Sequence, residues 1–542
     1  MVPHNLSPIT VPGGQVVASK VEKHDGNLLI ENNRAMGTLR LVEQLWTGRH
    51  NLVAIANHHL GSEGRPFATV KPRNTWKEGE FKVSLMVERA GKSGDVENDA
   101  FVQVFEPISN GEEANPGAVE ERVRVDIASW VLFKKLAPEI PTAQIIGFGL
   151  PDGTQFTHIS QLPQEYADDY VRRCREFSIG DEDIFATPFV PHECGNKLPV
   201  GLAYIIFKPV MRPGRLLSTV WNTDPTFDQI SNLWESFASI ISSLTKKTYS
   251  KIGSFLFNNN GTATLSNRPI YNAIVQLERD GVSPVMSRDR TFTSSTDFVE
   301  AVLKIQDDRV VKHPHAILNE LHCREQMGFR TLLHGLIRHL ISLEFCKGTF
   351  VAQIHDFDVD HFMVDEDWNI VCVLDIGSIA ILPIEMVHEP EWLTGVLVDE
   401  DEDSVPADVT RPAFIEVIGD RQKELNVRIH GPTGPILLAD VMTEAWESKA
   451  YWLLITLTTS FNMSDIAGPE LLPTFSDLSD EEIEEVDVAL WGPDPASVVQ
   501  RAMHNREHYI RQIVAKFGPG GEFGPDRDIV DLGPGGADDN FI

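Results

Sequence analysis

Cysteine is scarce in this sequence, with five residues among 542, an odd number, and no CxxC spacing. We therefore expect neither a disulfide framework nor a zinc site built from cysteine pairs. Long apolar runs are also missing, since no stretch of about 18 apolar residues could cross a bilayer. The first residues lack the charged start and apolar core of a secretory signal. These absences predict a reduced, cytoplasmic protein with no membrane partner.

Basic residues are few compared with acidic ones: 47 Lys and Arg stand against 79 Asp and Glu, a formal net charge of −32. Such a surface repels a phosphate backbone. No basic run is interleaved with aromatic residues, so we expect no nucleic-acid partner. We interpret the acidity as a contribution to solubility.

The order of strand-like and helix-like segments predicts two lobes. Short β-type runs separated by turns begin after Pro66, and one amphipathic helix, 119–137, lies among them before Pro138. After Pro213 the pattern becomes helical, with apolar residues at i, i+3, i+4 and i+7. The β-type runs are 67–70, 81–87, 100–105, 144–150 and 202–210; the later helices are 227–244, 325–345, 443–460 and 495–516.

This arrangement indicates the α+β class: an antiparallel sheet carrying one helix, followed by a mostly helical lobe. We divide the chain into an N-terminal extension of unknown role (1–65), an N-terminal lobe (66–212), a helical lobe (213–516) and a flexible tail (517–542). The tail repeats GPGG among acids and cannot bury a core. The acidic stretch 398–409 is interpreted as an exposed loop, and 477–487 as a helix start.

The segment that indicates chemistry is QIHDFDVDHFMVDEDWNIVCVLDIGSIAILP, residues 353–383. FMV and IVCVL are two apolar runs joined by the turn DEDWN, which predicts a hairpin. Asp356 precedes the first strand and Asp375 follows the second, so the hairpin should bring the two acids close together. Carboxylates gathered at a strand end suit Mg²⁺ held with nucleotide phosphates.

The same segment resembles the catalytic loop of aminoglycoside/choline kinase-like phosphotransferases. That family carries H-G-D-x-x-x-x-N followed by two hydrophobic residues and V-D, and then a turn, a strand and a hydrophobic-D-W-acid sequence. Here the chain reads IHDFDVDHFMVD, EDWNIVCV and LDIG, with the family spacing kept from the first aspartate to the second. Further segments, spread over about 75–465 in the family's order, resemble fungal members. They are PTAQIIGFG, AYIIFKPVMRPGRLL, KIGSFLF, PIEMVHEPEWLTG and EAWESKAYW.

The resemblance implies a bilobal kinase-like fold, ATP with Mg²⁺, and a small-molecule acceptor. It implies that Asp356 is the catalytic base, that Asp375 binds the metal, and that Gly79 lies in the turn covering the phosphates. Asp126 falls at the position of the family's helix glutamate. The hinge that adenine contacts would be 204–208, with Tyr204 and Ile206 among its cofactor-binding residues.

Two positions depart from the family pattern. Gln103 stands where the family has the strand lysine or arginine that holds the phosphates, and His361 stands at the metal-binding asparagine. A glutamine carries no charge, and imidazole is a poorer Mg²⁺ ligand than an oxygen donor. Lys71 is an alternative phosphate-binding lysine if the strand register differs. In addition, Ile354 replaces the loop histidine, and Ile376 with Gly377 replaces the Trp-acid pair.

Several alternatives stay open on the sequence alone. Asp126 is equally consistent with an exposed helix acid, and Gly79 with an ordinary turn glycine. Asp358 and Asp360 fit solvated loop acids, and His355 with His361 could form a transition-metal pair. For the whole chain, an active phosphotransferase competes with a pseudo-enzyme that binds or scaffolds without turnover. A nucleotide-free interaction module is the third possibility, and the sequence does not identify an acceptor.

Overall fold

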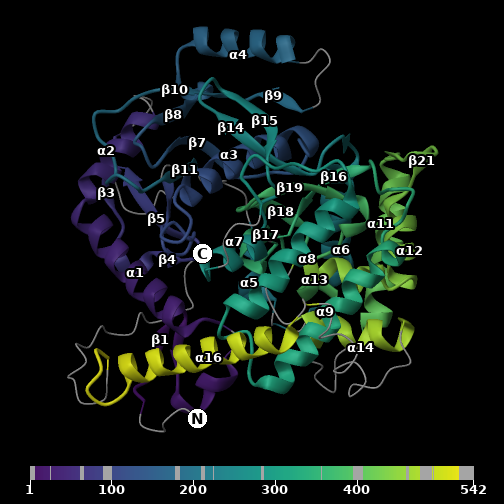
Figure 1. The fold of residues 1–542 in the computed structure, drawn as a ribbon. Coiled ribbons are helices and arrows are strands. Elements are labelled where there is room, and N and C mark those ends of the chain that lie inside the picture. The colour runs from purple at the N-terminus through teal and green to yellow at the C-terminus, as the bar shows by residue number, and fades with distance from the viewer. Residues whose placement is uncertain are drawn as a thin grey trace.

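The computed structural model describes residues 6–24, 26–60, 66–89, 100–177, 183–208, 214–221, 223, 225–281, 286–355, 357–394, 407–458, 463–475, 491 and 494–523. Figure 1 shows a β-rich part beside a helical part, with the N-terminal helices along the outer side of the first sheet. Asp356, most of the acidic stretch 398–409, all of 477–487 and the tail from 524 onward lie outside the described residues.

The first sheet is antiparallel, with the order β10-β8-β7-β11-β6-β5-β3, and β4 pairs with β5. The β-type runs predicted from the sequence form five of its strands, and two of the remaining strands come from the insertion that follows β7. Its strands are β3 (Phe67–Val70), β4 (Lys77–Glu78), β5 (Lys82–Arg89), β6 (Ala100–Phe105), β7 (Gln144–Gly149), β8 (Gln155–His158), β10 (Phe189–Pro191) and β11 (Tyr204–Lys208).

The two faces of this sheet pack on different elements because successive side chains alternate between them. Val102, Val104, Tyr204 and Ile206 face helices α1 (Leu28–Thr47) and α2 (Arg49–His59) and share one apolar cluster with them. Phe105, Ile205 and Phe207 face the other way, toward helix α3 (Ala118–Leu136). The N-terminal helices therefore complete one side of the sheet, and the side that carries α3 is directed at the second lobe.

A second, six-stranded sheet lies in the order β13-β16-β19-β14-β15-β9 and joins the two parts of the molecule. Helix α3 packs on β14 and β19, so one helix contacts both sheets. The bounds are β9 (Ile184–Ala186), β13 (Thr248–Tyr249), β14 (Gly253–Asn258), β15 (Thr262–Asn267), β16 (Phe350–Ile354) and β19 (Ile379–Pro383).

The predicted hairpin is confirmed. β17 (Phe362–Val364) pairs antiparallel with β18 (Ile370–Val373), and β12 (Arg215–Leu216) adds a third strand. The turn is held by Asp365, whose carboxylate accepts hydrogen bonds from the N–H groups of Asp367 and Asn369 at 3.0 and 2.9 Å. Trp368 takes a positive φ of 64° in that turn. Short polar side chains that bond their own backbone make such turns readable from sequence.

The rest of the chain is mainly helical, with two differences from the predicted segments. Helix α9 begins and ends about five residues before the predicted 325–345. The predicted helix 443–460 is two helices, because Lys449 adopts a left-handed backbone with φ 64° that interrupts the helical turn. The helices are α4 (Gln164–Phe177), α5 (Leu217–Val220), α6 (Phe227–Thr245), α7 (Asn272–Arg279), α8 (Ser295–Lys312), α9 (Glu320–Leu340), α10 (Glu391–Thr394), α11 (Ala407–Glu424), α12 (Leu438–Glu447), α13 (Ala450–Thr458), α14 (Met463–Phe475) and α16 (Pro495–Phe517).

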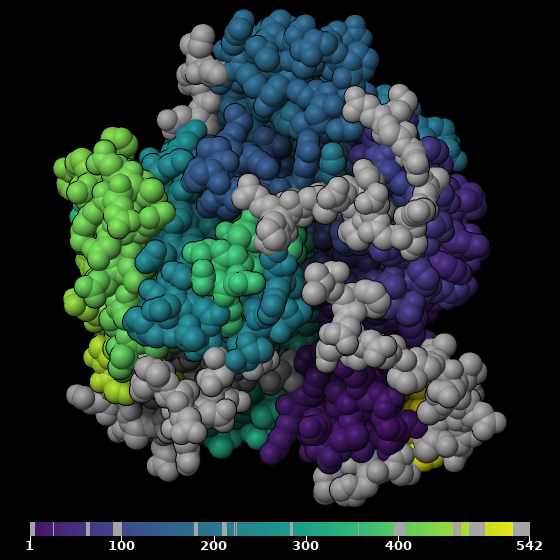
Figure 2. All heavy atoms as spheres, turned by 180° about the vertical axis from the view of Figure 1, so that it is seen from behind, coloured from purple at the N-terminus to yellow at the C-terminus, as the bar shows by residue number. Residues whose placement is uncertain are grey.

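Segments from the two ends of the described chain pack together. Strands β1 (Ile9–Val11) and β2 (Gly14–Val16) lie against α16, and the apolar cluster between them includes Ile9, Ile513 and Phe517. Seen from behind, the purple N-terminal segment borders yellow C-terminal atoms (Figure 2). The predicted flexible tail does not begin at Phe517, because Phe523 stacks on that ring with centroids 5.7 Å apart.

The architecture is therefore α+β: an antiparallel sheet with one helix on its inner face, and a mostly helical part that holds the hairpin. None of the helices in the described part of the chain has both the length and the apolar composition needed to cross a bilayer.

Candidate active site between the lobes

Three charged side chains from three elements meet where the first sheet, α3 and the hairpin come together. The Nζ of Lys82, the first residue of β5, lies 3.0 Å from Oδ2 of Asp126 on α3. The same Nζ lies 3.5 Å from Oδ2 of Asp375, just after β18. The lysine and both acids are largely buried. These contacts join one lysine from the first lobe to the acid that follows the hairpin.

Lys82 reaches this position because it follows a tight turn. The N–H of Gly79 donates to the carbonyl of Lys82 at 2.9 Å and closes the β4–β5 turn. A Cβ at Gly79 would stand 3.2 Å from that carbonyl, which is tighter than most real contacts. Burial alone would lower the pKa of the Lys82 ammonium, but the carboxylates of Asp126 and Asp375 raise it above its usual value. Lys82 is therefore a fixed positive charge at neutral pH.

Asp126 is fully buried on α3, so its interpretation as an exposed helix acid is wrong. Its Oδ1 accepts a hydrogen bond from Ser378 Oγ at 2.8 Å and one from Arg122 Nε at 3.2 Å. Its Oδ2 faces Lys82. This carboxylate has the contacts of a residue that orients the lysine.

Asp375 is held from several sides. Its Oδ1 accepts the N–H of Gly377 at 3.0 Å, and its Oδ2 accepts from Gln103 Nε2 at 3.2 Å. Burial alone would raise the pKa of the Asp375 carboxyl. The charge of Lys82, with smaller contributions from His361 and the Gly377 N–H, instead holds that pKa well below its usual range. The group is an anion at any physiological pH.

Gln103 lies beside Lys82 because the two strands are in register. Lys82 pairs with Phe105 and Ser84 pairs with Gln103, so Lys82 and Gln103 are diagonal neighbours on one face of the sheet. The Gln103 side chain is uncharged, as the sequence indicated, but the adjacent strand supplies a lysine to the same place. Oε1 of Gln103 is buried and has no hydrogen-bond partner among the described residues.

The donor set near Asp375 suits Mg²⁺. A carboxylate and an orphaned amide oxygen are the oxygen ligands that this ion prefers. Asp356, the other predicted acid, lies outside the described residues. The strand before it is described, and its last residue, Ile354, pairs with Ile379 of β19.

His361 is used in a local turn. Its Nδ1 accepts the N–H of Asp358 at 3.4 Å, while the Asp358 carboxylate accepts the N–H of Asp360, a reciprocal capping arrangement. The proposed His355–His361 metal pair is not supported by these contacts, because His355 Nδ1 lies 2.9 Å from Nε2 of His388 instead.

Two predicted cofactor-binding side chains point elsewhere. Tyr204 and Ile206 belong to the sheet face that α1 and α2 cover, and the Tyr204 hydroxyl lies 2.9 Å from Nε2 of His59. Their strand, β11, lies between β6 and β7 and pairs with both. The structure does not bring these side chains to the cluster of Lys82, Asp126 and Asp375.

The turn that begins at Gly79 is anchored to the helical lobe. Oε1 of Glu80 accepts from Gln276 Nε2 at 2.9 Å and from Arg279 Nη1 at 3.1 Å, both on α7. Phe81 packs in a small apolar cluster that includes Val275 of the same helix. The two lobes are therefore in contact at the turn next to Lys82.

Lys82 is the functional candidate that the sequence comparison missed. It is the second residue of the run FKVSLMV and follows Gly79 by three positions. Its place beside Gln103, on the same face of the sheet but on the neighbouring strand, follows only from the strand register. Lys71, the alternative named above, pairs with Glu88 at 3.6 Å.

No family model matches the chain, and no curated protein matches it. Several solved structures are similar to it, among them the following two. One is a thermostable mutant of aminoglycoside phosphotransferase APH(4)-Ia in a ternary complex with AMP-PNP and hygromycin B, at 12% identity and a TM-score of 0.32, covering 82% of this chain and 94% of that one. The other is the GDP and kanamycin complex of APH(2")-IIia, at 11% identity and a TM-score of 0.32, covering 74% and 98%. Likeness at this level assigns no family.

Proposed function

We propose that the chain is an ATP- and Mg²⁺-dependent phosphotransferase acting on a hydroxyl group of a small molecule. One observation carries the proposal: Lys82 Nζ lies between the helix acid Asp126 and the post-hairpin acid Asp375, at 3.0 and 3.5 Å. A lysine held by a helix carboxylate beside a metal-binding aspartate is what phosphoryl transfer needs to position and neutralise phosphates.

Each side chain has a role in this proposal. Lys82 binds phosphate oxygens of the nucleotide, and Asp126 keeps its ammonium in place. Asp375 and Gln103 offer oxygen ligands to Mg²⁺, which when bound neutralises the charge of the transferring group. Asp356 accepts the proton of the acceptor hydroxyl. The hydroxyl oxygen then bonds to the γ-phosphorus while the bond between that phosphorus and ADP breaks. Gly79 allows the turn to run close to the phosphates.

A binding protein without turnover is the second candidate, and particular contacts favour it. Asp375 already has Lys82, Gln103 and the Gly377 N–H as partners, and His361, at the metal-ligand position, uses Nδ1 in a turn cap. A nucleotide bound there would lack the asparagine oxygen of the family pattern. The two candidates share nucleotide binding and differ in phosphoryl transfer.

The test is nucleotide binding by calorimetry, with and without Mg²⁺, for wild type, Lys82→Met and the control Lys71→Met. We expect Mg²⁺-dependent ATP binding in wild type and in the control, and a loss of at least about tenfold in Lys82→Met, equal to about 1.4 kcal/mol. Equal affinity in all three proteins would refute the assignment of Lys82. Release of ADP with panels of small hydroxyl compounds then separates the enzyme from the binding protein.

A further inference from the structure

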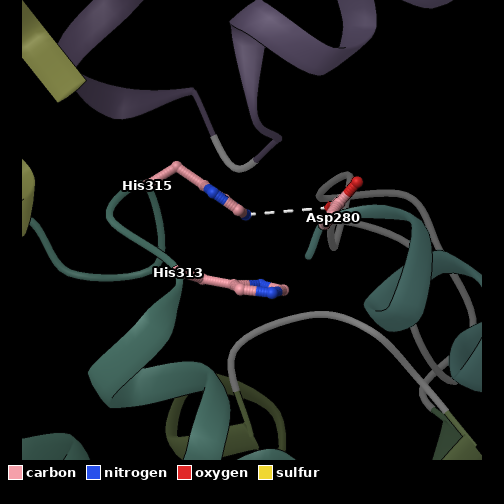
Figure 3. A group of neighbouring side chains, drawn as sticks. All are labelled: Asp280, His313 and His315. Atoms are coloured by element: carbon pink, nitrogen blue, oxygen red, sulfur yellow. Dashed lines mark ion pairs between the residues drawn. The ribbon is translucent and has the colours of Figure 1, made fainter. Parts of the chain in front are cut away.

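Two histidines and one aspartate converge at a place remote in sequence from the proposed active-site residues. His313 and His315 flank Pro314 in the connection between α8 and α9, and Asp280 directly follows α7 (Figure 3). One ligand atom from each of the three lies within 4.8 Å of the others. Nε2 of His315 stands 3.9 Å from Oδ2 of Asp280, the contact drawn as a dashed line.

The imidazoles are buried without the hydrogen bonds that burial normally requires. His313 is 2% exposed and His315 is 3% exposed. Both ring nitrogens of His313, and Nδ1 of His315, have no hydrogen-bond partner within the described ranges. An unsatisfied buried polar group costs about 1–3 kcal/mol, so three such nitrogens in one place call for a ligand.

The surroundings hold the three side chains in place. Arg506 of α16 donates to the carbonyl of Pro314 at 3.2 Å and to that of His315 at 3.4 Å. The N–H of His313 caps the end of α8 by donating to the Arg309 carbonyl at 2.9 Å. Arg279 Nε donates to Oδ1 of Asp280 at 3.3 Å, which leaves Oδ2 turned toward His315.

We propose that His313, His315 and Asp280 form a binding site for a divalent transition metal, Zn²⁺ in the first place. Zn²⁺ takes imidazole nitrogen and carboxylate oxygen at about 2.0–2.2 Å, so ligand atoms end about 3.4 Å apart in a tetrahedron. The ligand atoms now lie within 4.8 Å of one another, so each pair needs to approach by about 1.4 Å at most. Water takes the fourth position. The ion would join the end of α7 to the α8–α9 connection.

The positive charges of Arg309 and Arg506 act against a cation here. Asp280 offsets part of that charge, and the guanidinium of Arg506 is engaged with backbone carbonyls, including that of Glu22 at 2.8 Å. We therefore expect zinc affinity in the micromolar range rather than that of a cysteine site.

The experiment uses the full chain without a histidine tag, stripped by chelator and titrated with Zn²⁺ against a chromophoric chelator. We expect one Zn²⁺ per chain, and a loss of about 100-fold or more in His313→Gln and His315→Gln, since even partners behind a ligand are worth about 10- to 100-fold. The matched control is His339→Gln, an exposed histidine on α9, which should bind as wild type does.

A second measurement tests the proposal even if the histidine variants do not fold. Co²⁺ added to the stripped wild type should give the visible absorption of a four-coordinate site, and Asp280→Asn, which keeps the side-chain shape, should weaken it. The proposal is overturned if wild type binds Zn²⁺ no better than the double variant His313→Gln/His315→Gln, or if Co²⁺ shows only the spectrum of the aqueous ion.

Discussion

Helix α3 carries two buried charge clusters five residues apart. In each, one base bridges two acids and a further arginine binds the helix acid: Arg288 binds Glu121, and Arg122 binds Asp126. The clusters differ in how completely the bridging base is used. Near its start, Arg268 holds Glu121 with bonds of 3.0 and 2.9 Å and binds Glu278 with two further bonds. In the next turn, Lys82 holds Asp126 at 3.0 Å and Asp375 at 3.5 Å. The base that bridges the first cluster is a planar guanidinium that saturates it, and the base that bridges the second is a single ammonium.

The difference separates a structural cluster from a binding one. A guanidinium matches carboxylates bidentately and leaves little capacity for another ligand. A lysine is a point charge that can turn toward a phosphate, and the buried Oε1 of Gln103 beside it has no partner in the described structure. The same count of charges thus gives a fixed crosslink at one place and a ligand-ready centre at the other.

The largest expected effect comes from breaking the saturated cluster. Arg268→Met leaves Glu278 buried without the cation that binds it and Glu121 with the partly exposed Arg288 alone, and should lower the free energy of unfolding by about 3–5 kcal/mol in chemical denaturation. Mg²⁺-dependent ATP affinity should be unchanged wherever the variant is folded. Arg288→Met, which removes a partly exposed arginine from the same cluster, is the control and should cost under about 1 kcal/mol.

A carboxylate without a cation extends the comparison. Glu385 accepts one hydrogen bond, from the Ser342 N–H at 2.8 Å, and burial raises its pKa to about 7. Because this folded-state pKa exceeds the unfolded value of about 4.3, the contribution of Glu385 to stability is greatest below about pH 4.3, falls as the pH rises from there to about 7, and is constant above it. In Glu385→Gln this loss should be absent. The difference in free energy of unfolding between the variant and the wild type should therefore be about 3 kcal/mol more favourable to the variant at pH 8 than at pH 5, as measured by denaturation at both pH values.

Asp375 should behave in the opposite way. Its pKa is depressed, so its stabilising contribution is complete above the unfolded value of about 3.9 and is lost only as pH falls below it. The cost of Asp375→Asn should therefore be the same at pH 5 and pH 8. A cost that changes between these two pH values would show that the carboxylate is not held by Lys82.

A charge swap tests whether the cation can come from either strand. Lys82→Gln alone should weaken Mg²⁺-dependent ATP binding by at least about tenfold, or about 1.4 kcal/mol. Adding Gln103→Lys returns a positive charge from the neighbouring strand on the same face and should recover most of that loss in calorimetry. If the double variant binds no better than the single one, the two positions do not serve the same phosphates.

The smallest expected effect concerns the opposite face of the sheet. Tyr204→Phe removes the hydroxyl that contacts His59, and should cost about 1 kcal/mol of stability with no change in nucleotide affinity. Thermal denaturation and calorimetry measure the two quantities. A clear fall in affinity would mean that the Tyr204 side chain lies at the nucleotide after all.

The sequence predicted features that depend on local chemistry. The hairpin turn was predictable because Asp365 bonds its own neighbours, and α3 because its apolar residues repeat at helical spacing and a proline follows. Lys82 was missed because its role depends on a diagonal contact across two strands, which no spacing along one strand contains. The break at Lys449 was missed because a left-handed lysine has no sequence signature.

The proposed metal site was likewise not predictable from the sequence alone. The His-Pro-His sequence at 313–315 was visible, but its third member, Asp280, lies more than thirty positions earlier and is brought near by the packing of α7. Burial, which leaves the imidazoles without partners, is likewise a property of the folded chain alone.

The contact between Leu28 and Tyr509 forms late, because the two residues are synthesised far apart in time. The Leu28 N–H donates to the Tyr509 hydroxyl across 481 positions. At a synthesis rate of about 5–20 residues per second, roughly 25–100 s separate the appearance of these two residues. Throughout that interval Ile9, Val16 and Leu28 have no apolar partner from α16 to cover them. These three residues therefore stay without that cover for tens of seconds during synthesis, which gives a chaperone time to act on them.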